Sequence, residues 1–351
     1  MSQHPESKKN PLRSVITADG KVYPTPLFLP VFQYRNPFVT IDMLEQEFGV
    51  QGLITNAFFL YKDRELKKIV LTQGIREFLG FHGLIVTDSG AFQQFSGPLY
   101  LSNKKIIRFQ QEIGVDVISP LDLITPPGDN RTTATRKLAL TLKRIEEGLG
   151  LVDQAILIGV QQGGRFLELR GQALEKLIEF EVKYIALGSL VPMFTKNHHL
   201  EFLGKVLKQA RRIVPDHIPI HLYGAGDPVE IPFYVALGCD IFDSSSFIHY
   251  ARGKWYMTPY GAFDVKQNPP ETMPYTCECP YCKRFGPELW SDEKQLARHN
   301  LWMILHVFQE IKQRLATDTL AEYLQDVLVV HQQWFPHSQL VKSWNTLDMQ
   351  R

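Results

Sequence analysis

The stretch LIVTDSGAFQQF, residues 84–95, shows the pattern on which the fold of this chain depends. An apolar run typical of a buried strand ends abruptly at Asp88, and Ser89 and Gly90 follow. Asp-Ser-Gly after a strand is also typical of a turn or a helix N-cap, so this stretch alone leaves a structural and a functional interpretation open. The rest of the chain has to decide between them.

Similar apolar runs recur along the chain, with amphipathic segments between them. The eight predicted strands are TPLFLPVF (25–32), QGLITNA (51–57), GLIVTDS (83–89), VDVISPLD (115–122), AILIGVQQ (155–162), KYIALGSLV (183–191), IPIHLYG (218–224) and CDIFDSS (239–245). Between them, residues 102–114 and 131–149 carry apolar side chains at helical spacing.

This alternation predicts an α/β fold, a (β/α)8 TIM barrel, for which about 250 residues are typical. A doubly wound open sheet is the alternative, since alternation alone does not separate the two. No Gly-x-Gly-x-x-Gly segment opens a helix, which disfavours the nucleotide-binding version of that alternative.

The composition predicts three parts. The polar residues 1–20 lack the apolar core of a signal peptide and are expected to form a flexible tail, and residues 21–262 form the catalytic barrel. Residues 263–351, rich at first in proline, cysteine and charge, are expected to form a zinc-binding subdomain and C-terminal helices. These helices, at 296–316 and 319–335, would pack on the barrel exterior.

The bulk composition is that of an ordinary soluble globular protein. Of 351 residues, 44% are hydrophobic and 21% charged, and the sequence contains no apolar run of the length that a membrane span needs. A cytoplasmic protein without a membrane partner is therefore expected. The net charge of +1 means that a nucleic-acid site would be a local patch, for which basic groups at 136–137, 208–212 and 251–254 are candidates, although charged helix faces are usually just solvated.

Polar residues stand at the end of one predicted strand after another. They are Asn56, Asp88 with Ser89, Asp122, Gln162 with Gly163, Gly188 with Ser189, Tyr223 with Gly224, and Asp243 with Ser244. Taken singly, each carboxylate has an adequate interpretation as a turn or cap. Together on the C-terminal face of a barrel they would repel one another unless substrate, cation or protonation intervened, which favours an active site.

Carboxylates facing a common cavity suit glycosyl chemistry. One attacks the anomeric carbon, and another exchanges protons with the leaving group or the incoming nucleophile. Phe92 and Tyr223 offer flat apolar faces between which a planar ring could stack, with about 1–3 kcal/mol gained per stacked base.

A second cluster has metal-ligand spacing. Cys277, Cys279 and Cys282, with His299 further on, form a Cys3His set suited to tetrahedral zinc. All four positions are filled by protein, so a structural zinc site is predicted. The alternative is three incidental cysteines and a histidine on a helix surface.

Several long segments resemble the tRNA-guanine transglycosylase family, and specifically its archaeosine branch. The resemblance covers about residues 22–315. It rests on ITNAFFLYKDREL (54–66), VTDSGAFQQF (86–95), IGVDVISPLDLITPP (113–127), VQQGG (160–164), HLYGAGDP (221–228), GCDIFDSSSFIHYARGKWYMTPYG (238–261), CECPYC (277–282) and HNLW (299–302). The resemblance implies a (β/α)8 barrel with structural zinc that replaces a guanine in tRNA by a 7-deazaguanine, with 7-cyano-7-deazaguanine as the expected base.

The resemblance also implies roles for individual residues. Asp243 would be the nucleophile at C1′ of the target ribose, and Asp88 the general acid/base. The base-binding residues would be Asp122 at the pyrimidine edge, Ser89, Gln162, Gly188 and Ser189 around it, and Phe92 and Tyr223 on the two faces. The target nucleotide would be flipped out to enter such a pocket.

Two departures from the family leave the partner open. The threonine- and arginine-rich run of the queuosine branch is replaced by SSSFIHYARGKW (244–255), and the further C-terminal domains of the archaeosine branch are not matched. Site choice could therefore fall to a separate RNA-binding subunit, to a homodimer, or to DNA as the substrate. A silent partner subunit and a glycoside hydrolase are alternatives from other classes, but the three aspartates disfavour the first and the aromatic pair disfavours the second.

Overall fold

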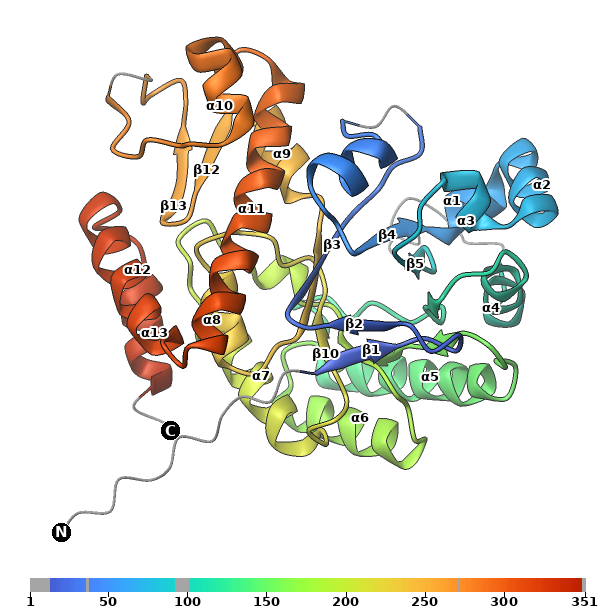
Figure 1. The fold of residues 1–351 in the computed structure, drawn as a ribbon. Helices are drawn as coiled ribbons and strands as arrows, with labels where there is room; N and C mark the ends of the chain where they lie inside the picture. Colours follow the sequence, from blue (N-terminus) through green and yellow to red (C-terminus); the bar gives the residue numbers. More distant parts are fainter. Residues whose placement is uncertain (1–12, 36–37, 92–100, 270–271, 349–351) are drawn as a thin grey trace.

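The computed structural model describes residues 13–35, 38–91, 101–269 and 272–348 (Figure 1). Its core consists of two parallel sheets, one with the strand order β3-β11-β10-β9-β8 and one with the order β4-β5-β6-β7. The strands are β3 (Leu27–Pro30), β4 (Gly52–Asn56), β5 (Leu84–Asp88), β6 (Val117–Ile118), β7 (Ile156–Leu157), β8 (Gly159–Gln161), β9 (Ile185–Leu187), β10 (Ile220–Leu222) and β11 (Ile241–Ser244). All eight predicted strand regions are confirmed, with β7 and β8 both inside the predicted run 155–162.

The two sheets touch along both of their edges. Val31 and Ile54 form a parallel bridge that links the β3 and β4 edges. At the other edge only Ile158 separates β7 from β8. Its N–H donates to the carbonyl of Ile118 (2.9 Å), whereas the next N–H, of Gly159, donates to Tyr184 (2.8 Å), so the chain passes from one sheet to the other within one residue.

Side chains alternate between two apolar clusters, as the two-residue period of a strand requires. The smaller cluster draws on both sheets and contains Leu27, Leu29, Ile54, Leu84, Val86, Val117, Ile158, Val160, Tyr184, Ala186 and Ile241. The intervening residues, such as Ile85 and Phe242, join the larger cluster under the helices. The residues two positions beyond the members of the smaller cluster have the same orientation. They include Asn56, Asp88, Gln162, Gly188 and Asp243, which the sequence analysis placed at the strand ends.

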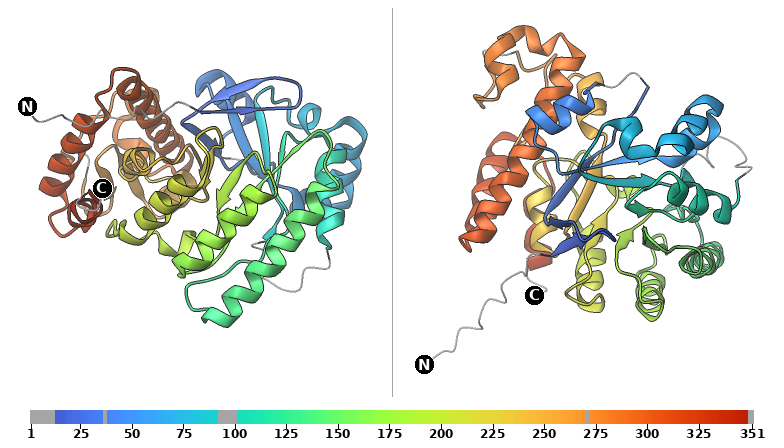
Figure 2. Two further views of the ribbon diagram at one scale, coloured as in Figure 1. Left: turned by 90° about the horizontal axis from the view of Figure 1, so that it is seen from below. Right: turned by 45° about the vertical axis from the view of Figure 1, so that its right-hand side comes forward.

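Helices cover the outer sides of the sheets (Figures 1 and 2). They are α1 (Ala57–Lys62), α2 (Arg64–Gln73), α3 (Ile75–Leu79), α4 (Asn103–Glu112), α5 (Arg131–Leu149), α6 (Leu167–Glu179), α7 (Glu201–Ile213), α8 (Ile231–Ala236) and α9 (Ser246–Arg252), with shorter turns η1 (Met43–Glu47) and η3 (Val191–Met193). The helices predicted at 102–114 and 131–149 are confirmed. They begin where Ser102 and Asn130 accept hydrogen bonds from the first-turn N–H groups of Lys105 and Thr133.

The C-terminal part lies to one side of the sheets, drawn orange and red in Figure 1. It comprises the hairpin β12 (Trp255–Thr258) and β13 (Gly261–Asp264), α10 (Pro280–Phe285), η5 (Gly286–Trp290), α11 (Glu293–Ala316), α12 (Leu320–Trp334) and α13 (Leu340–Asp348). Phe308 of α11 packs against Phe28 and Phe242 on the outer side of β3 and β11. The helix α13, which was not predicted, packs Trp344 against Phe233 of α8.

The N-terminal segment differs from the expected tail over its last residues. Inside the range 1–20, β1 (Ser14–Ile16) pairs antiparallel with β2 (Val22–Pro24). The pairing is anchored because Val15 is buried and the guanidinium of Arg13 lies 2.9 Å from the carboxylate of Asp240. Residues 1–12 lie outside the described residues, and the three-part division of the chain stays a prediction. Among the described helices, none is both long and apolar enough to cross a membrane.

Candidate functional site

Asp243 is the residue before the last of β11 and is 9% exposed. Its Oδ1 accepts a hydrogen bond from the N–H of Gly224 (3.2 Å) and lies 2.9 Å from Nε2 of the fully buried His221. The other ring nitrogen of His221 lies 3.0 Å from the hydroxyl of Tyr184. If the Tyr184 hydroxyl donates to Nδ1, the ring hydrogen is on Nε2, close to the carboxylate of Asp243 but outside hydrogen-bond geometry in the described structure.

Asp88 ends β5 beside Asn56, which ends β4. The Asn56 amide donates to Oδ2 of Asp88 (3.0 Å), and the N–H of Gly90 donates to Oδ1 (3.2 Å). The turn interpretation of Asp-Ser-Gly is therefore correct in part, because Gly90, at φ +86°, closes a turn on the carboxylate. Burial, with the charges of Asp122 and Asp243 adding to it, raises the pKa of Asp88 to about 7.

Asp122 follows β6 and belongs to a chain of hydrogen bonds. The Gln162 amide donates to its Oδ2 (2.6 Å), the Ser189 hydroxyl donates to the Gln162 oxygen (2.6 Å), and the N–H of Thr125 donates to the Ser189 hydroxyl (2.8 Å). Burial raises the pKa of Asp122 to about 6, while the hydrogen bond from Gln162 and the charge of Arg144 act in the opposite direction.

Side chains of two outer helices hold the loop that carries Asp122. Asn103 of α4 accepts from the N–H of Leu121 (2.9 Å), and Arg144 of α5 donates to the carbonyl of Leu121 (2.6 Å). Thr141 of α5 accepts from the N–H of Leu123 (3.0 Å). Sequence reasoning missed all three, because their helical positions show no pairing to a loop twenty residues away.

We call the three carboxylates (Asp88, Asp122 and Asp243) the carboxylate site. The charges of all three act on Tyr223. Burial raises the pKa of Tyr223 well above its usual range, and the charges of all three carboxylates add to this effect. Its hydroxyl lies 3.4 Å from that of Ser119. The charges of the three predicted aspartates thus all act on Tyr223, whereas Phe92, the predicted second ring, lies outside the described residues.

Ser89 and Gly188, two of the predicted base-binding residues, have different surroundings. Ser89 is 1% exposed, and within the described ranges its hydroxyl has no hydrogen-bond partner. The carbonyl of Gly188 accepts from Arg170 (3.1 Å), so this carbonyl is already occupied.

Arg170 of α6 is a supporting residue that the sequence analysis did not identify. It is fully buried and also donates to the carbonyl of Gly164 (2.7 Å) and the side-chain oxygen of Gln161 (2.8 Å). Burial lowers its pKa to about 9. Its three contacts join the ends of β8 and β9, the segments that carry Gln162 and Ser189.

A cavity of about 830 Å³ opens next to Asp243. Its lining includes Gly224, whose N–H contacts Asp243, together with Gly226 and Ser246 from the same strand ends. The rest of the lining includes aromatic side chains (Phe194, Tyr250, Trp255, Phe263, Trp334 and Phe335), basic ones (Lys196, His198, His249 and His337) and acidic ones (Asp227, Glu230 and Asp264).

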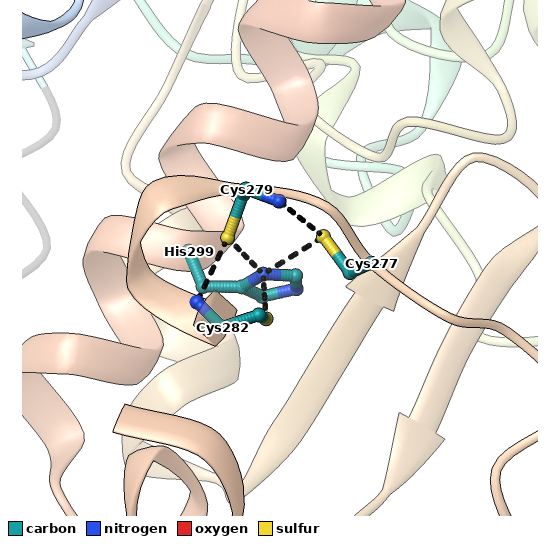
Figure 3. A group of neighbouring side chains, drawn as sticks. All are labelled: Cys277, Cys279, Cys282 and His299. Atoms are coloured by element: carbon teal, nitrogen blue, oxygen red, sulfur yellow. Dashed lines mark hydrogen bonds between the residues drawn. The ribbon is translucent and has the colours of Figure 1, made fainter. Parts of the chain in front are cut away.

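The four predicted metal ligands come together, and we call them the cysteine cluster (Cys277, Cys279, Cys282 and His299). Their ligand atoms all lie within 4.8 Å of one another. Figure 3 shows the three sulfurs around Nδ1 of His299, at 3.8 Å from Cys277, 3.4 Å from Cys279 and 3.3 Å from Cys282.

The surroundings of the cysteine cluster orient its ligands. The other ring nitrogen of His299, Nε2, lies 2.9 Å from the carbonyl of Met257, which leaves the Nδ1 lone pair for a metal. The N–H of Cys282 donates to the sulfur of Cys279 (3.2 Å), and the hydroxyl of Tyr256 lies 3.2 Å from the sulfur of Cys282. This donor set could hold a four-coordinate metal ion.

Several basic groups that were candidates for phosphate contacts have partners within the chain. Lys137 donates to Asp129 (2.6 Å), and Lys254 donates to the carbonyl of Ser291 (2.9 Å). Arg211 lies 3.3 Å from Asp240. These groups support loops, so they are weaker candidates for nucleic-acid contacts than the sequence indicated.

Comparisons with known proteins show the family of the chain. Residues 11–333 match the family described as queuine tRNA-ribosyltransferase. Proteins named tRNA-guanine(15) transglycosylase are similar to the chain: 36% identity in Methanopyrus kandleri, covering 90% of this chain and 69% of the relative, and 34% in Methanosarcina mazei, covering 88% and 63%. The one from Pyrococcus furiosus is 33% identical over 86% of this chain but only 51% of its own length. The chain thus spans about half to two thirds of these relatives.

Proposed function

Because the chain belongs to the queuine tRNA-ribosyltransferase family, we propose that it is a tRNA-guanine transglycosylase. It exchanges a guanine in tRNA for a 7-deazaguanine base, of which 7-cyano-7-deazaguanine is the expected form. The observation that carries this proposal is the carboxylate site, in which Asp88, Asp122 and Asp243 each accept a hydrogen bond from a residue at the end of another strand, namely Asn56, Gln162 and Gly224.

A closed (β/α)8 barrel is the arrangement that best accounts for the two sheets. The Val31–Ile54 bridge joins one pair of edges, and the change of partner at Ile158 and Gly159 joins the other. The small apolar cluster drawn from both sheets would then be the barrel interior. The carboxylate site would lie at the C-terminal face, where barrels of this type carry their active sites.

Asp243 is the nucleophile in this proposal. Its carboxylate oxygen forms a bond to C1′ of the target ribose while the bond from C1′ to N9 of guanine breaks, which leaves a covalent ribosyl ester. The Gly224 N–H and His221, both near Oδ1, would keep the carboxylate oriented.

Asp88 moves the proton. It donates a proton to the leaving guanine, and it then takes one from the incoming 7-deazaguanine, whose ring nitrogen attacks C1′ and releases Asp243. A pKa of about 7 suits this role because both protonation states are accessible near neutral pH.

The base is held by hydrogen bonding and stacking. Asp122 would accept from the donors on the pyrimidine edge, supported by Gln162, while Tyr223 and Phe92 stack on the ring. Ser89, Gly188 and Ser189 complete the proposed pocket. The aromatic and basic lining of the neighbouring cavity suits flanking nucleotides of a flipped-out substrate.

Zinc is the proposed metal of the cysteine cluster, in a structural role. Tetrahedral zinc with usual bond lengths separates a sulfur and a nitrogen ligand by about 3.6 Å, and the three S···Nδ1 distances are 3.3–3.8 Å. Four protein ligands leave no open position for substrate, so zinc would supply folding stability rather than chemistry.

Exchange of labelled guanine tests the function. The protein is incubated with labelled guanine and either bulk tRNA or duplex DNA, and Asp243→Asn serves as the control. Label in tRNA that depends on Asp243 supports the proposal, and label in DNA alone moves the same chemistry to another nucleic acid. Label in neither refutes it. Mass spectrometry of the denatured protein–RNA mixture would detect the ester at Asp243.

A further inference from the structure

Ser189 has an unusual backbone conformation for a serine. It follows β9 directly and has φ +58°, in the left-handed region that residues with a Cβ atom rarely occupy. Such strain persists only where surrounding interactions impose it, and it is concentrated at functional sites. The contacts of the Ser189 side chain therefore need an explanation.

The hydroxyl of Ser189 is committed on both sides. It accepts from the N–H of Thr125 (2.8 Å) and donates its single hydrogen to the Gln162 oxygen (2.6 Å). With its oxygen held, the Gln162 amide presents its nitrogen to Oδ2 of Asp122 (2.6 Å). The hydroxyl thus acts on Asp122 through Gln162.

Gly188 holds the same amide from another direction. A Cβ atom at this position would lie 2.6 Å from the Gln162 nitrogen, so only glycine lets the amide pack this closely against β9. Buried Arg170 fixes the Gly188 carbonyl. The amide therefore lies between a hydroxyl that selects its orientation and a backbone that limits its movement.

We propose that Ser189 is a positioning residue that, through Gln162, keeps Asp122 an ionised acceptor and thereby selects bases that carry adjacent N1–H and 2-amino donors. This inference rests on the proposed function, since it assumes that Asp122 receives the base. A 2-amino-6-oxo ring such as guanine places two donors against the carboxylate. A 2,6-diamino ring has an acceptor at N1, which an ionised Asp122 rejects and a protonated one tolerates.

The electrostatic surroundings of Asp122 agree with this role. The hydrogen bond from Gln162 and the charge of Arg144 lower its pKa, against the effect of burial. Among the described residues, the charge of Asp122 also acts on Asp88 and Tyr223. The backbone N–H of Asp122 also favours the ionised form, and of these three groups only Gln162 is hydrogen-bonded to Ser189.

Binding measurements without nucleic acid test the inference. The variants Ser189→Ala and Ser189→Gly both lack the hydroxyl, but only glycine is relieved of the left-handed strain. Ser343→Ala, which removes a buried hydroxyl on α13, is the matched control. Equilibrium dialysis with labelled guanine and labelled 2,6-diaminopurine, from pH 5 to 9, gives affinity, selectivity and the pH midpoint of binding.

Both Ser189 variants should have a pH midpoint raised by about one unit, so they should bind guanine about threefold more weakly near pH 6.5 and about tenfold more weakly near pH 5, where the ionised fraction falls tenfold per pKa unit. Their preference for guanine over 2,6-diaminopurine should fall by a similar factor, and Ser343→Ala should match the unmodified protein. Thermal denaturation checks that each variant is folded.

Folded variants with unchanged midpoint and selectivity would overturn the inference. The inference would also be overturned if Ser189→Ala and Ser189→Gly differed from each other in midpoint or selectivity as much as they differ from the unmodified protein. Such a result would point to backbone strain. A protein that binds guanine but transfers none to tRNA or DNA would refute the proposed function while leaving the Ser189 comparison valid. A protein that binds no guanine at any pH would overturn this inference itself.

Discussion

The carboxylate site and the cysteine cluster both gather ionisable side chains, but they are assembled and stabilised in different ways. Three members of the cysteine cluster lie within six residues of chain, and a bound cation would neutralise their charge. The carboxylate site gathers three acids from distant strand ends, and burial with mutual repulsion raises the pKa of Asp88. The first arrangement favours folding, whereas the second opposes it in return for reactivity.

The largest expected effect sets Asp243 against its neighbour Asp240. Asp243→Asn should lower the exchange rate roughly ten-thousand-fold, as removal of a nucleophile does, with the free energy of unfolding retained. Asp240→Asn should retain the exchange rate and lower the free energy of unfolding, since Asp240 pairs with Arg13 (2.9 Å) and Arg211 (3.3 Å) in the interior. Breaking such a buried pair costs about 3–5 kcal/mol. Single-turnover kinetics and urea denaturation measure the two effects, and equal rates in both variants would contradict the assignment of Asp243.

The next test removes one ligand from the cysteine cluster. Cys279→Ser should release the metal and lower the free energy of unfolding by several kcal/mol, because metal binding at a structural site contributes to folding. Cys239→Ala is the matched control: this cysteine is also buried, but its sulfur lies near the carbonyls of Ile220 (3.6 Å) and Ile241 (3.5 Å) and outside the cysteine cluster. It should keep its metal and lose about 1 kcal/mol. Atomic absorption and thermal denaturation would show the difference, and full metal content in Cys279→Ser would exclude that ligand.

Asp88→Asn, unlike Cys279→Ser, should raise the free energy of unfolding. Its pKa is about 7 in the folded protein against the usual 3.8, so from pH 4 to 7 the unfolded chain loses the proton more readily and rising pH lowers stability. The substitution should therefore stabilise the protein above pH 7, by at most about 4 kcal/mol, and have no such effect below pH 4. Exchange should fall by a factor of about 10² to 10⁴. Denaturation at pH 4 and pH 8 checks the sign, and a variant less stable at pH 8 would contradict it.

The smallest expected effect concerns Tyr184, which acts on Asp243 only through His221. Tyr184→Phe removes the hydroxyl 3.0 Å from Nδ1 and so the preference for a hydrogen on Nε2. We expect a severalfold loss in kcat and a cost of about 1 kcal/mol in stability. An unchanged kcat in a folded variant would show that the His221 tautomer does not matter to Asp243.

The pattern of strand and helix was predictable because it depends on local periodicity. All eight strand regions and the helix Arg131–Leu149 follow from the spacing of apolar residues and from caps such as Asn130. Two of the elements that were not predicted, β1 and α13, are short and are held by contacts between residues far apart in the chain, such as Arg13 with Asp240 and Trp344 with Phe233. Spacing in the sequence carries no record of such contacts.

For the residues of the site, too, local sequence pattern identifies some and leaves out others. His221 could have been found, since the alternation in IPIHLYG places it on the same face as Tyr223. Arg170 could not, because a buried arginine on a helix reads as a charged surface position until its three acceptors are in place.

By itself the sequence determined the metal-ligand set and the polar strand ends, since both depend on the order of residues over short distances. The tertiary structure decided which strand ends are neighbours, and therefore that Asp88 lies in the field of Asp122 and Asp243. It also decided that the Ser189 hydroxyl is directed to Gln162. These properties depend on burial and on distances between groups far apart in the chain, which only the folded protein defines.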